Sequence, residues 1–588
     1  MRFCKRVWSL LAAIVFVGGT LWAQSSSGSI AGVVEDESGA VIPGATVTVT
    51  NVDTGISRAV TSDGAGRYRV PGIIPGHYEV QAEATGFQTE VRKGLQLTVG
   101  SDMAINLTLK VGQVTEKTVV TAEAPIVETT TSTMAGLVDD KTIRDLPLNG
   151  RSFDQLISLE SSAPAYRLQR TNVANGMMDV FSVNGARTRA NTFLMDGTEL
   201  VGAGIATSGP GGVLGKNMGV DAVQEFKVLT GNYSAAYGKR AGGVINIATR
   251  SGTNQIHGSG FEFLRNDNLD ARNFFDQTPQ PPEFRRNQFG GAVGGPIRKD
   301  QAFYFGNFEG LREGLGLTNL AIVPDDNGRR GLLPDRNNPG QFVNVGVAPE
   351  VRPFFSLFPP PNGRNFGDGT AESFSAPTQV SSQDFVLTRV DHKISDKDFL
   401  MGRYNFMRAR RVSPEVNPYF GNFDSSHDNS ISLEEKRIYA TTLNSARFAF
   451  SRSRALNTSA PLIDVDPSLA FYPGAAAVGQ ISFTSATGAS GLTAAGIGTS
   501  YDRHYIINQF EVSDQVFHQR GGHSLSMGVQ VQKIQHNENY GSNKLGSFEF
   551  VDLASFLQGK ARLFRSASPS GGGDATKAYR LTYFSTFV

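Results

Sequence analysis

The second half of the chain alternates between apolar and polar residues over long stretches. In one of them, Leu525, Met527, Val529 and Val531 take one face, while Ser524, Ser526, Gly528, Gln530 and Gln532 take the other. Strands of roughly ten residues with one apolar and one polar face are typical of a transmembrane β-barrel. Residues 313–380 and 455–500, rich in Pro, Gly, Ser and Asn, would be its extracellular loops. We therefore assign residues 253–588 to an outer-membrane β-barrel.

Two shorter segments within this region fit the same assignment. Gln301–Arg312 is an aromatic-rich strand suited to the girdle at a membrane interface. Residues 386–394 and 399–406 flank the polar segment 395–398 and predict a hairpin with a short turn of the periplasmic type.

Residues 28–112 contain shorter alternating runs between turn residues. The apolar members of these runs share one face in pairs: Val47 with Val49, Tyr68 with Val70, and Tyr78 with Val80. This is the pattern of half-buried strands. A spacing of about ten residues per strand predicts a β-sandwich of about seven strands.

The N-terminus has the layout of a secretory signal. Arg2, Lys5 and Arg6 precede the apolar stretch Val7–Trp22, and Ala23 ends it before a polar run. We expect residues 1–23 to be a cleaved signal peptide; an uncleaved anchor helix is the alternative. No later stretch approaches about 18 uninterrupted apolar residues, so the exported chain is predicted to be periplasmic, secreted or a β-barrel.

Charge and cysteine content exclude several kinds of function. Lys+Arg number 55 and Asp+Glu 54, so the net charge of +1 provides no global field to attract nucleic acid. Cys4 is the single cysteine, which rules out a disulfide scaffold, a Cys-ligated zinc site and a CxxC motif. The eight histidines form no HExxH-like pair. We expect no catalytic residues, no cofactor and no metal site.

A short β-prone run, Thr118–Ala122, lies in the linker 113–129, ahead of a Pro- and Thr-rich stretch. A strand-forming segment in a flexible linker can bind a partner by adding a strand to an exposed sheet edge. By periodicity alone, this run is better explained as one more strand or as a linker than as a segment that binds a partner.

The next segment contains paired turn and glycine motifs in a definite order. They are Asn184-Gly185, Asp196-Gly197, Tyr237-Gly238 and Gly242-Gly243, followed by Asn246. Together they resemble the plug domain of TonB-dependent outer-membrane receptors. The resemblance implies an α/β plug at 130–252 and a TonB-type energy-transducing complex as a partner. It also implies a TonB box, formed by Thr118, Val119, Val120, Thr121 and Ala122.

Two more resemblances flank the plug. The motifs Gly32–Asp36, Pro43–Ala45, Gly66–Tyr68, Pro75–Tyr78 and Thr85–Phe87 are similar to those of a carboxypeptidase-regulatory-like domain, a β-sandwich module that is not a peptidase. Residues 266–275, 287–297 and 305–312, with Arg389–His392 and Gly402–Tyr404, resemble Oar-like receptors. The glycines at 290–295 lack the Lys-Ser/Thr of a phosphate loop. The sandwich is interpreted as a spacer or scaffold, with ligand contact as the alternative.

The expected fold class is mainly β, with a sandwich, an α/β plug and part of a large barrel. The expected function is a TonB-dependent outer-membrane receptor that takes up an extracellular polymer, glycan, peptide or metal chelate. A surface adhesin without transport is the alternative. An exported hydrolase is disfavoured, because no nucleophile, base or metal constellation is present. Outer-membrane lipid is an expected partner, and nucleic acid is not.

The number of strands raises a separate expectation about the length of the protein. Barrels that house a folded plug need about 22 strands, whereas residues 253–588 predict about ten or eleven. Residues 579–588 have a strand pattern that reaches the last residue of the sequence. We therefore expect the chain to be part of a longer working protein; a complete, smaller barrel with the plug docked outside is the alternative.

Overall fold

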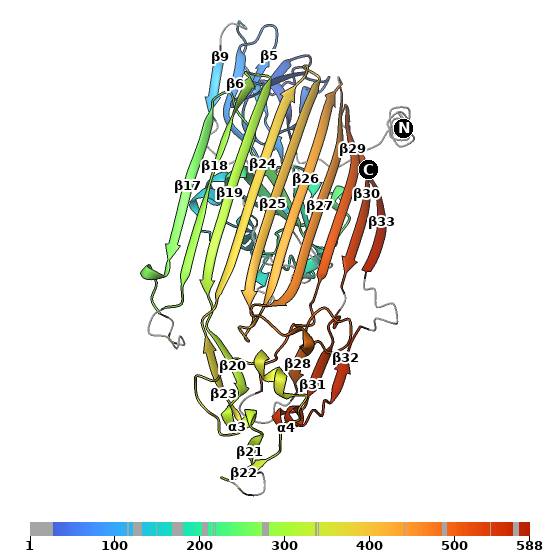
Figure 1. The fold of residues 1–588 in the computed structure, drawn as a ribbon. Helices are drawn as coiled ribbons and strands as arrows, with labels where there is room; N and C mark the ends of the chain where they lie inside the picture. The colour runs from blue at the N-terminus through green and yellow to red at the C-terminus, as the bar shows by residue number, and fades with distance from the viewer. Residues whose placement is uncertain are drawn as a thin grey trace.

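The computed structural model describes the chain except for residues 1–26, 114–116, 122–131, 149, 167–179, 203–209, 216, 218, 273, 275–280, 336–337, 339, 440, 485–490, 522, 541 and 568–575. The predicted signal peptide therefore lies outside the described residues. A β-sandwich stands at one end of a tall sheet, a folded loop module stands at the other, and a plug packs against one face of the sheet (Figure 1). The expected fold class, mainly β, is confirmed. None of the helices in the described part of the chain has the length and hydropathy that a bilayer-spanning helix requires.

The sandwich consists of two sheets around one apolar core. One sheet has the order β4-β1-β7, with β8 also paired to β1, and the other has the order β3-β2-β5-β6-β9. The alternating valines and tyrosines of the sequence supply this core, where Val47, Val70 and Val80 are fully buried. The bounds are β1 Gly28–Asp36, β2 Thr46–Asn51, β3 Ser57–Thr61, β4 Arg67–Ile73, β5 Gly76–Glu83, β6 Thr89–Leu97, β7 Asp102–Ala104, β8 Leu107–Leu109 and β9 Lys117–Thr121.

The plug is a small sheet with short helices. Its strand order is β10-β15-β16-β13-β14, and β13 and β16 pair in parallel. Helix α2 (Asp140–Asp145) begins at Asp139, whose side chain accepts the amide of Thr142 at 2.8 Å. Apolar residues of this sheet share one core with inward residues of the tall sheet. The strands are β10 Met134–Val138, β13 Thr192–Met195, β14 Thr198–Glu199, β15 Val223–Gly231 and β16 Val244–Thr249, and the separate hairpin is β11 Ala165–Tyr166 with β12 Val180–Phe181.

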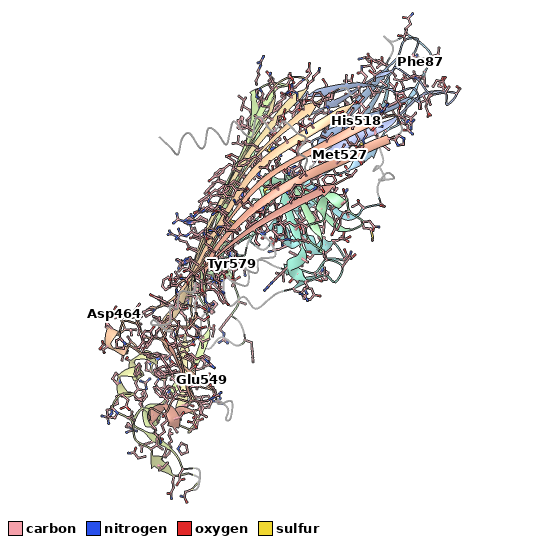
Figure 2. The ribbon with its side chains drawn as sticks, turned by 90° about the vertical axis from the view of Figure 1, so that its right-hand side faces the viewer. Phe87, Asp464, His518, Met527, Glu549 and Tyr579 are labelled. Carbon is pink, nitrogen blue, oxygen red and sulfur yellow. The ribbon has the colours of Figure 1, made fainter. Side chains whose placement is uncertain are left out.

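The tall sheet has ten antiparallel strands, and β17 and β33 form its edges in the described chain. It curves around the plug (Figure 2). On β30 the predicted alternation holds for Gln530 and Gln532, which are buried, and for Leu525, which is exposed. It does not hold for Val529, which is buried, or for Ser524, which is exposed. The strands are β17 His257–Asn266, β18 Phe284–Arg298, β19 Ala302–Gly316, β24 Thr378–Lys393, β25 Asp398–Pro414, β26 Phe420–Ile438, β27 Thr442–Pro461, β29 Arg503–Arg520, β30 His523–Asn539 and β33 Thr576–Phe587.

The connections differ sharply in length between the two ends of the sheet. Short turns join the strands at 299–301, 394–397 and 439–441, beside the sandwich. Most connections at the other end are long, with the exception of residues 415–419 between β25 and β26. Short turns on the periplasmic side with long loops outside are the rule for outer-membrane barrels. The sandwich thus stands at the short-turn end of the sheet.

The long connections fold together into a module with its own core. Nine of its phenylalanines take part in ring contacts, and the ring of Phe556 meets those of Phe355, Phe358, Phe483 and Phe550. Asp552 caps helix α4 (Leu553–Leu557) with a capping box. The other elements are β20 Asn319–Pro324, α3 Asp326–Arg329, β21 Leu332–Pro334, β22 Phe342–Asn344, β23 Thr370–Ser375, β28 Gln480–Phe483, β31 Ser547–Phe550 and β32 Leu563–Arg565.

Candidate functional site: the charged contacts of the plug

Asp196 is the centre of the contact between the plug and the sheet. It occupies the turn between β13 and β14 with a φ of 46°, a left-handed conformation that Asp tolerates better than most residues. Its carboxylate accepts the amide and hydroxyl of Thr249 at 2.9 and 2.8 Å. It also accepts Arg403 Nη1 at 2.6 Å and lies 3.4 Å from Arg389 Nη1. One plug carboxylate therefore links two strands of the sheet, β24 and β25.

The electrostatics of this contact follow from its burial. Burial acts to raise the pKa of Asp196, but Arg403 and Arg389 outweigh it and hold that pKa below its ordinary value. The side chain of Arg403 is 0% exposed. Asp196 is thus a fixed anion that balances buried guanidinium charge.

The residue after Asp196 extends the contact to the next strands. Gly197 has a φ of 76°, and its carbonyl accepts a hydrogen bond from Arg447 on β27 at 2.5 Å. A Cβ at this position would lie 2.4 Å from that guanidinium, and the left-handed φ strains other residues, so glycine is favoured here. Arg447 in turn lies 3.4 Å from Glu434 on β26.

Glu199 forms a second charged centre toward the far strands. Its carboxylate meets Lys239 at 2.5 Å and Arg240 at 3.1 Å, both from the plug, and accepts Gln532 of β30 at 3.2 Å. Burial acts to raise the pKa of Glu199, while Lys239 and Arg240 lower it below its ordinary value. Lys239 also lies 4.8 Å from the ring centre of Tyr583 on β33.

Arg151 joins the plug to the other side of the sheet. It contacts Asp221 of the plug at 2.8 Å and Glu309 of β19 at 3.0 Å. Glu309 also accepts the amide of Gly219 at 2.6 Å, and the guanidinium of Arg151 stacks 3.9 Å from the ring centre of Phe261. The plug is therefore held by polar contacts to strands on both sides of the curve.

The sandwich contacts the plug through a different carboxylate. Glu225 of β15 is 3% exposed and accepts the backbone amide of Val99 from the sandwich. Burial raises the pKa of Glu225 to about 7. A cavity of about 100 Å³ separates the sandwich from the short-turn end of the sheet, lined by Ile73 and Tyr78 on one side and Met401 and Leu443 on the other.

The strand expected to bind a partner is formed, and it pairs within the chain. Thr118, Val119, Val120 and Thr121 lie on β9, which runs parallel to β6 with Thr118 opposite Glu90. The Thr118 hydroxyl lies 3.2 Å from Gln88 Oε1, and Val119 is 54% exposed. Since β9 ends its sheet, its outer edge has no partner strand among the described residues. Ala122 lies outside the described residues.

The predicted plug residues separate into three groups. Asp196 and Gly197 lie at the sheet interface, whereas Gly242, Gly243 and Asn246 lie inside the plug, where a Cβ on Gly242 would lie 2.6 Å from the Ala190 carbonyl. Asn184-Gly185 forms a turn, and Asn184 donates to the Thr230 carbonyl at 2.6 Å, whereas Tyr237 ends a short 3-10 helix that Gly238 caps.

Sequence reasoning placed three of the plug's contacts on the sheet in motifs that resemble Oar-like receptors, but it did not identify them as contacts of the plug. Arg389, Arg403, Arg447 and Glu309 are charged residues at inward positions of alternating strands. That signal was available, because a charge on the lumen side of a barrel strand requires a partner. Among the residues that the structure describes, no three His, Cys, Asp or Glu side chains gather as a metal site would require.

Parts of the chain are similar to known proteins. The chain is 27% identical over 322 residues to the TonB-dependent transporter Oar of Myxococcus xanthus, covering 52% of this chain and 29% of that protein. It is 33% identical over 115 residues to the probable TonB-dependent siderophore receptor PirA of Acinetobacter baumannii, covering 19% and 14%. The chain thus spans less than a third of each relative. Neither relative is described as an enzyme.

A structural comparison matches the outer membrane transporter YddB of Escherichia coli, with a TM-score of 0.46 and 12% identity over 77% of this chain and 54% of that one. The model of the carboxypeptidase regulatory-like domain matches residues 29–110. The expected resemblance to Oar-like TonB-dependent receptors with this N-terminal module is confirmed. The model of the outer membrane beta barrel domain matches residues 248–588, more than half of the chain, and the chain belongs to this family.

Proposed function

We propose that the protein is a TonB-dependent receptor that carries an extracellular ligand across the outer membrane. The observation that carries this proposal is the plug, which is held by buried charged contacts to the sheet and is preceded by a strand-forming segment with an open edge. A surface adhesin needs neither feature. The ligand would be an extracellular polymer, glycan, peptide or metal chelate.

We propose that the TonB-type partner binds at β9. A strand that ends its sheet offers a row of backbone donors and acceptors, and pairing along such an edge gives affinity without a side-chain code. The partner would extend the sandwich sheet beyond β9 or replace β6 at its other edge. Force on β9 reaches the plug through the chain, because residues 122–133 lead directly to β10.

Replacing Val120 by proline is expected to abolish binding of the periplasmic domain of a TonB-type protein. Proline removes a backbone donor and fixes φ, so the strand can no longer pair normally. The measurement is titration calorimetry of the full chain in detergent with that domain. Val119→Thr is the matched control, since it keeps the β-branch and the backbone amide. Equal affinity of the Val120→Pro variant and the wild type would contradict the assignment.

Measuring the uptake of ligand by cells distinguishes a transporter from an adhesin. Deleting residues 116–122 should stop uptake by cells while ligand binding at the surface survives. An adhesin would bind ligand at the surface without uptake in either the wild type or the deletion variant, and uptake that survives the deletion would contradict the role of residues 116–122.

We also propose that the chain is exported with cleavage near Ala23. The basic, apolar and small-residue layout of the first 23 residues supports this. N-terminal sequencing of the protein from outer-membrane fractions should begin close to Gln24. Recovery from the inner membrane with Met1 retained would contradict it.

A further inference from the structure

A second cavity, of about 160 Å³, lies where the sandwich meets the short-turn end of the tall sheet. Strands β3 and β4 form its wall on the sandwich side, and the turns that join β26 to β27 and β29 to β30 form the other wall. It adjoins the smaller cavity described above, because Arg58 and Leu443 line both. The charged side chains of its described lining are three arginines and one carboxylate: Arg58, Arg67, Arg69 and Asp63.

Arg58 has no counter-charge among the residues that the structure describes. It lies on β3 opposite Val49, which is buried in the core of the sandwich, so its side chain extends toward the space between the two sheets. Its Nη1 donates to the backbone carbonyl of Pro71 on β4, and no described carboxylate lies within 4 Å of it. Burial lowers the pKa of Arg58 to about 10, so the guanidinium is still charged at neutral pH. A buried charge without a partner is costly, and an anion beside it would remove that cost.

The other two arginines of the cavity are only partly paired. Arg69 Nη2 lies 2.8 Å from Asp102, and its guanidinium carbon lies 5.0 Å from the ring centre of Phe517. The Nε of Arg69 is nevertheless buried without a hydrogen-bond partner. Arg67 contacts Asp63 at 3.5 Å. The three guanidinium groups therefore share two carboxylates, and one positive charge at the cavity is not compensated within the described part of the chain.

The position of the cavity determines which anions can enter it. Leu443 and Phe517 line it from the sheet. Leu443 is four residues before Arg447, and Phe517 is six residues after Glu511. Side chains an even number of residues apart on a strand share a face, and Arg447 and Glu511 are buried on the face turned to the plug. The cavity therefore opens beneath the sheet and away from its lipid-facing surface, so its ligand would be a soluble anion.

We propose that this cavity binds a small tetrahedral oxyanion of the phosphate class, and that the bound anion fastens the sandwich to the sheet. Guanidinium groups match phosphate oxygens with paired N–H donors. Arg58 and Arg69 would bind the anion from β3 and β4, and the hydroxyl of Thr441 would bind it from the turn between β26 and β27. Donors on several sides suit a tetrahedral anion better than a planar carboxylate. The volume holds one such anion with a few waters, since a water in the liquid takes about 30 Å³.

The experiment is titration calorimetry of the purified full chain in detergent with inorganic phosphate, at neutral pH and at an ionic strength held constant with sodium chloride. Arg58→Gln keeps a donor for the Pro71 carbonyl and removes the charge, and about tenfold weaker binding of phosphate is expected. The matched control is Lys93→Gln, which removes a positive charge from an exposed side chain of the sandwich that pairs with Glu79 at 3.2 Å. This control should bind phosphate as the wild type does.

Competition tests the class of anion. Sulfate, which is also tetrahedral, should displace phosphate from the wild type, whereas acetate at the same concentration should not. Absence of saturable phosphate binding to the wild type, equal competition by acetate, equal affinity of the wild type and Arg58→Gln, or an equal loss in Lys93→Gln would each overturn the proposal. If Arg58→Gln fails to fold, Arg69→Gln takes its place with the same expected loss.

Hydrogen exchange tests whether the anion fastens the sandwich. The amide of Val99 donates to Glu225 across the contact between the sandwich and the plug, so its exchange reports on docking of the sandwich. Saturating phosphate should slow exchange at this amide in the wild type and in Lys93→Gln, but not in Arg58→Gln. Binding of phosphate with no slowing in the wild type would overturn the second half of the proposal.

Discussion

Replacing Asp196 by alanine is expected to lower the free energy of unfolding by about 3–5 kcal/mol, the usual effect of breaking a buried ion pair. The carboxylate is the acidic partner of Arg403, whose side chain is fully buried, and it also binds Thr249. Without it, a guanidinium stays in the interior with no counter-charge. The measurement is denaturant unfolding of the full chain in detergent.

The matched control for this substitution is Asp396→Ala in a short turn. Asp396 is 92% exposed and pairs with Lys393, so its loss should change stability by less than about 1 kcal/mol. An effect of Asp196→Ala as small as that of the control would contradict the role of the contact. A double variant with Arg403→Ala should cost less than the sum of the single variants, because the two side chains share one interaction.

The pH dependence of this contact has a definite sign. Since the pKa of Asp196 is lowered in the folded chain, its contribution is present above the unfolded pKa and is lost as pH falls through the folded one. The arginines do not titrate in that range. Acidification should therefore weaken the plug contact in the wild type, and that weakening should be absent from the Asp196→Ala variant.

Glu225→Gln is expected to stabilise the protein at pH 8 by about 3 kcal/mol and to leave stability at pH 4 nearly unchanged. The pKa of Glu225 is raised from 4.5 to about 7 in the folded chain. The folded chain therefore holds the proton more tightly, and stability falls as pH rises from about 4.5 to about 7. Glutamine can still accept the amide of Val99 but cannot ionise.

Unfolding at a series of pH values tests this prediction, and hydrogen exchange at the Val99 amide reports on the same contact locally. Glu37→Gln is the control, because Glu37 is exposed and pairs only weakly with Lys110 at 3.8 Å. The wild type and the Glu225→Gln variant should differ in pH slope, and the Glu37→Gln variant should follow the wild type. Parallel slopes of stability against pH for the wild type and Glu225→Gln would mean that ionisation of this carboxylate does not affect the stability of the protein.

The sequence predicted elements wherever local alternation determines which face is buried. Val47 with Val49 and the run 524–532 identify strands because burial on one side requires that pattern. Strands β3, β6 and β7 were not predicted. In β3 (Ser57–Thr61) exposed and half-buried positions alternate and none is fully buried, so its hydrophobic signal is weak.

The charged contacts could not be read from the sequence, because their partners are far apart along it. Asp196 was selected as a turn residue, and its turn is confirmed, but Arg403 is 207 residues away. Likewise, nothing local indicates that β9 pairs with β6 rather than standing alone, since both outcomes require the same β-prone residues. The TonB-box assignment of Thr118–Ala122 stays a prediction.

The wide separation of these partners has a consequence for the order of assembly. Each strand of the tall sheet pairs with the next strand of that sheet along the chain, so most of its loops close at low entropic cost. The contacts that seat the plug join Asp196 to Arg403 and Glu199 to Gln532, the latter across 333 residues. Such contacts close last. Until then the carboxylates of Asp196 and Glu199 stay hydrated. When the plug packs against the sheet, these anions and their cationic partners lose their hydration together.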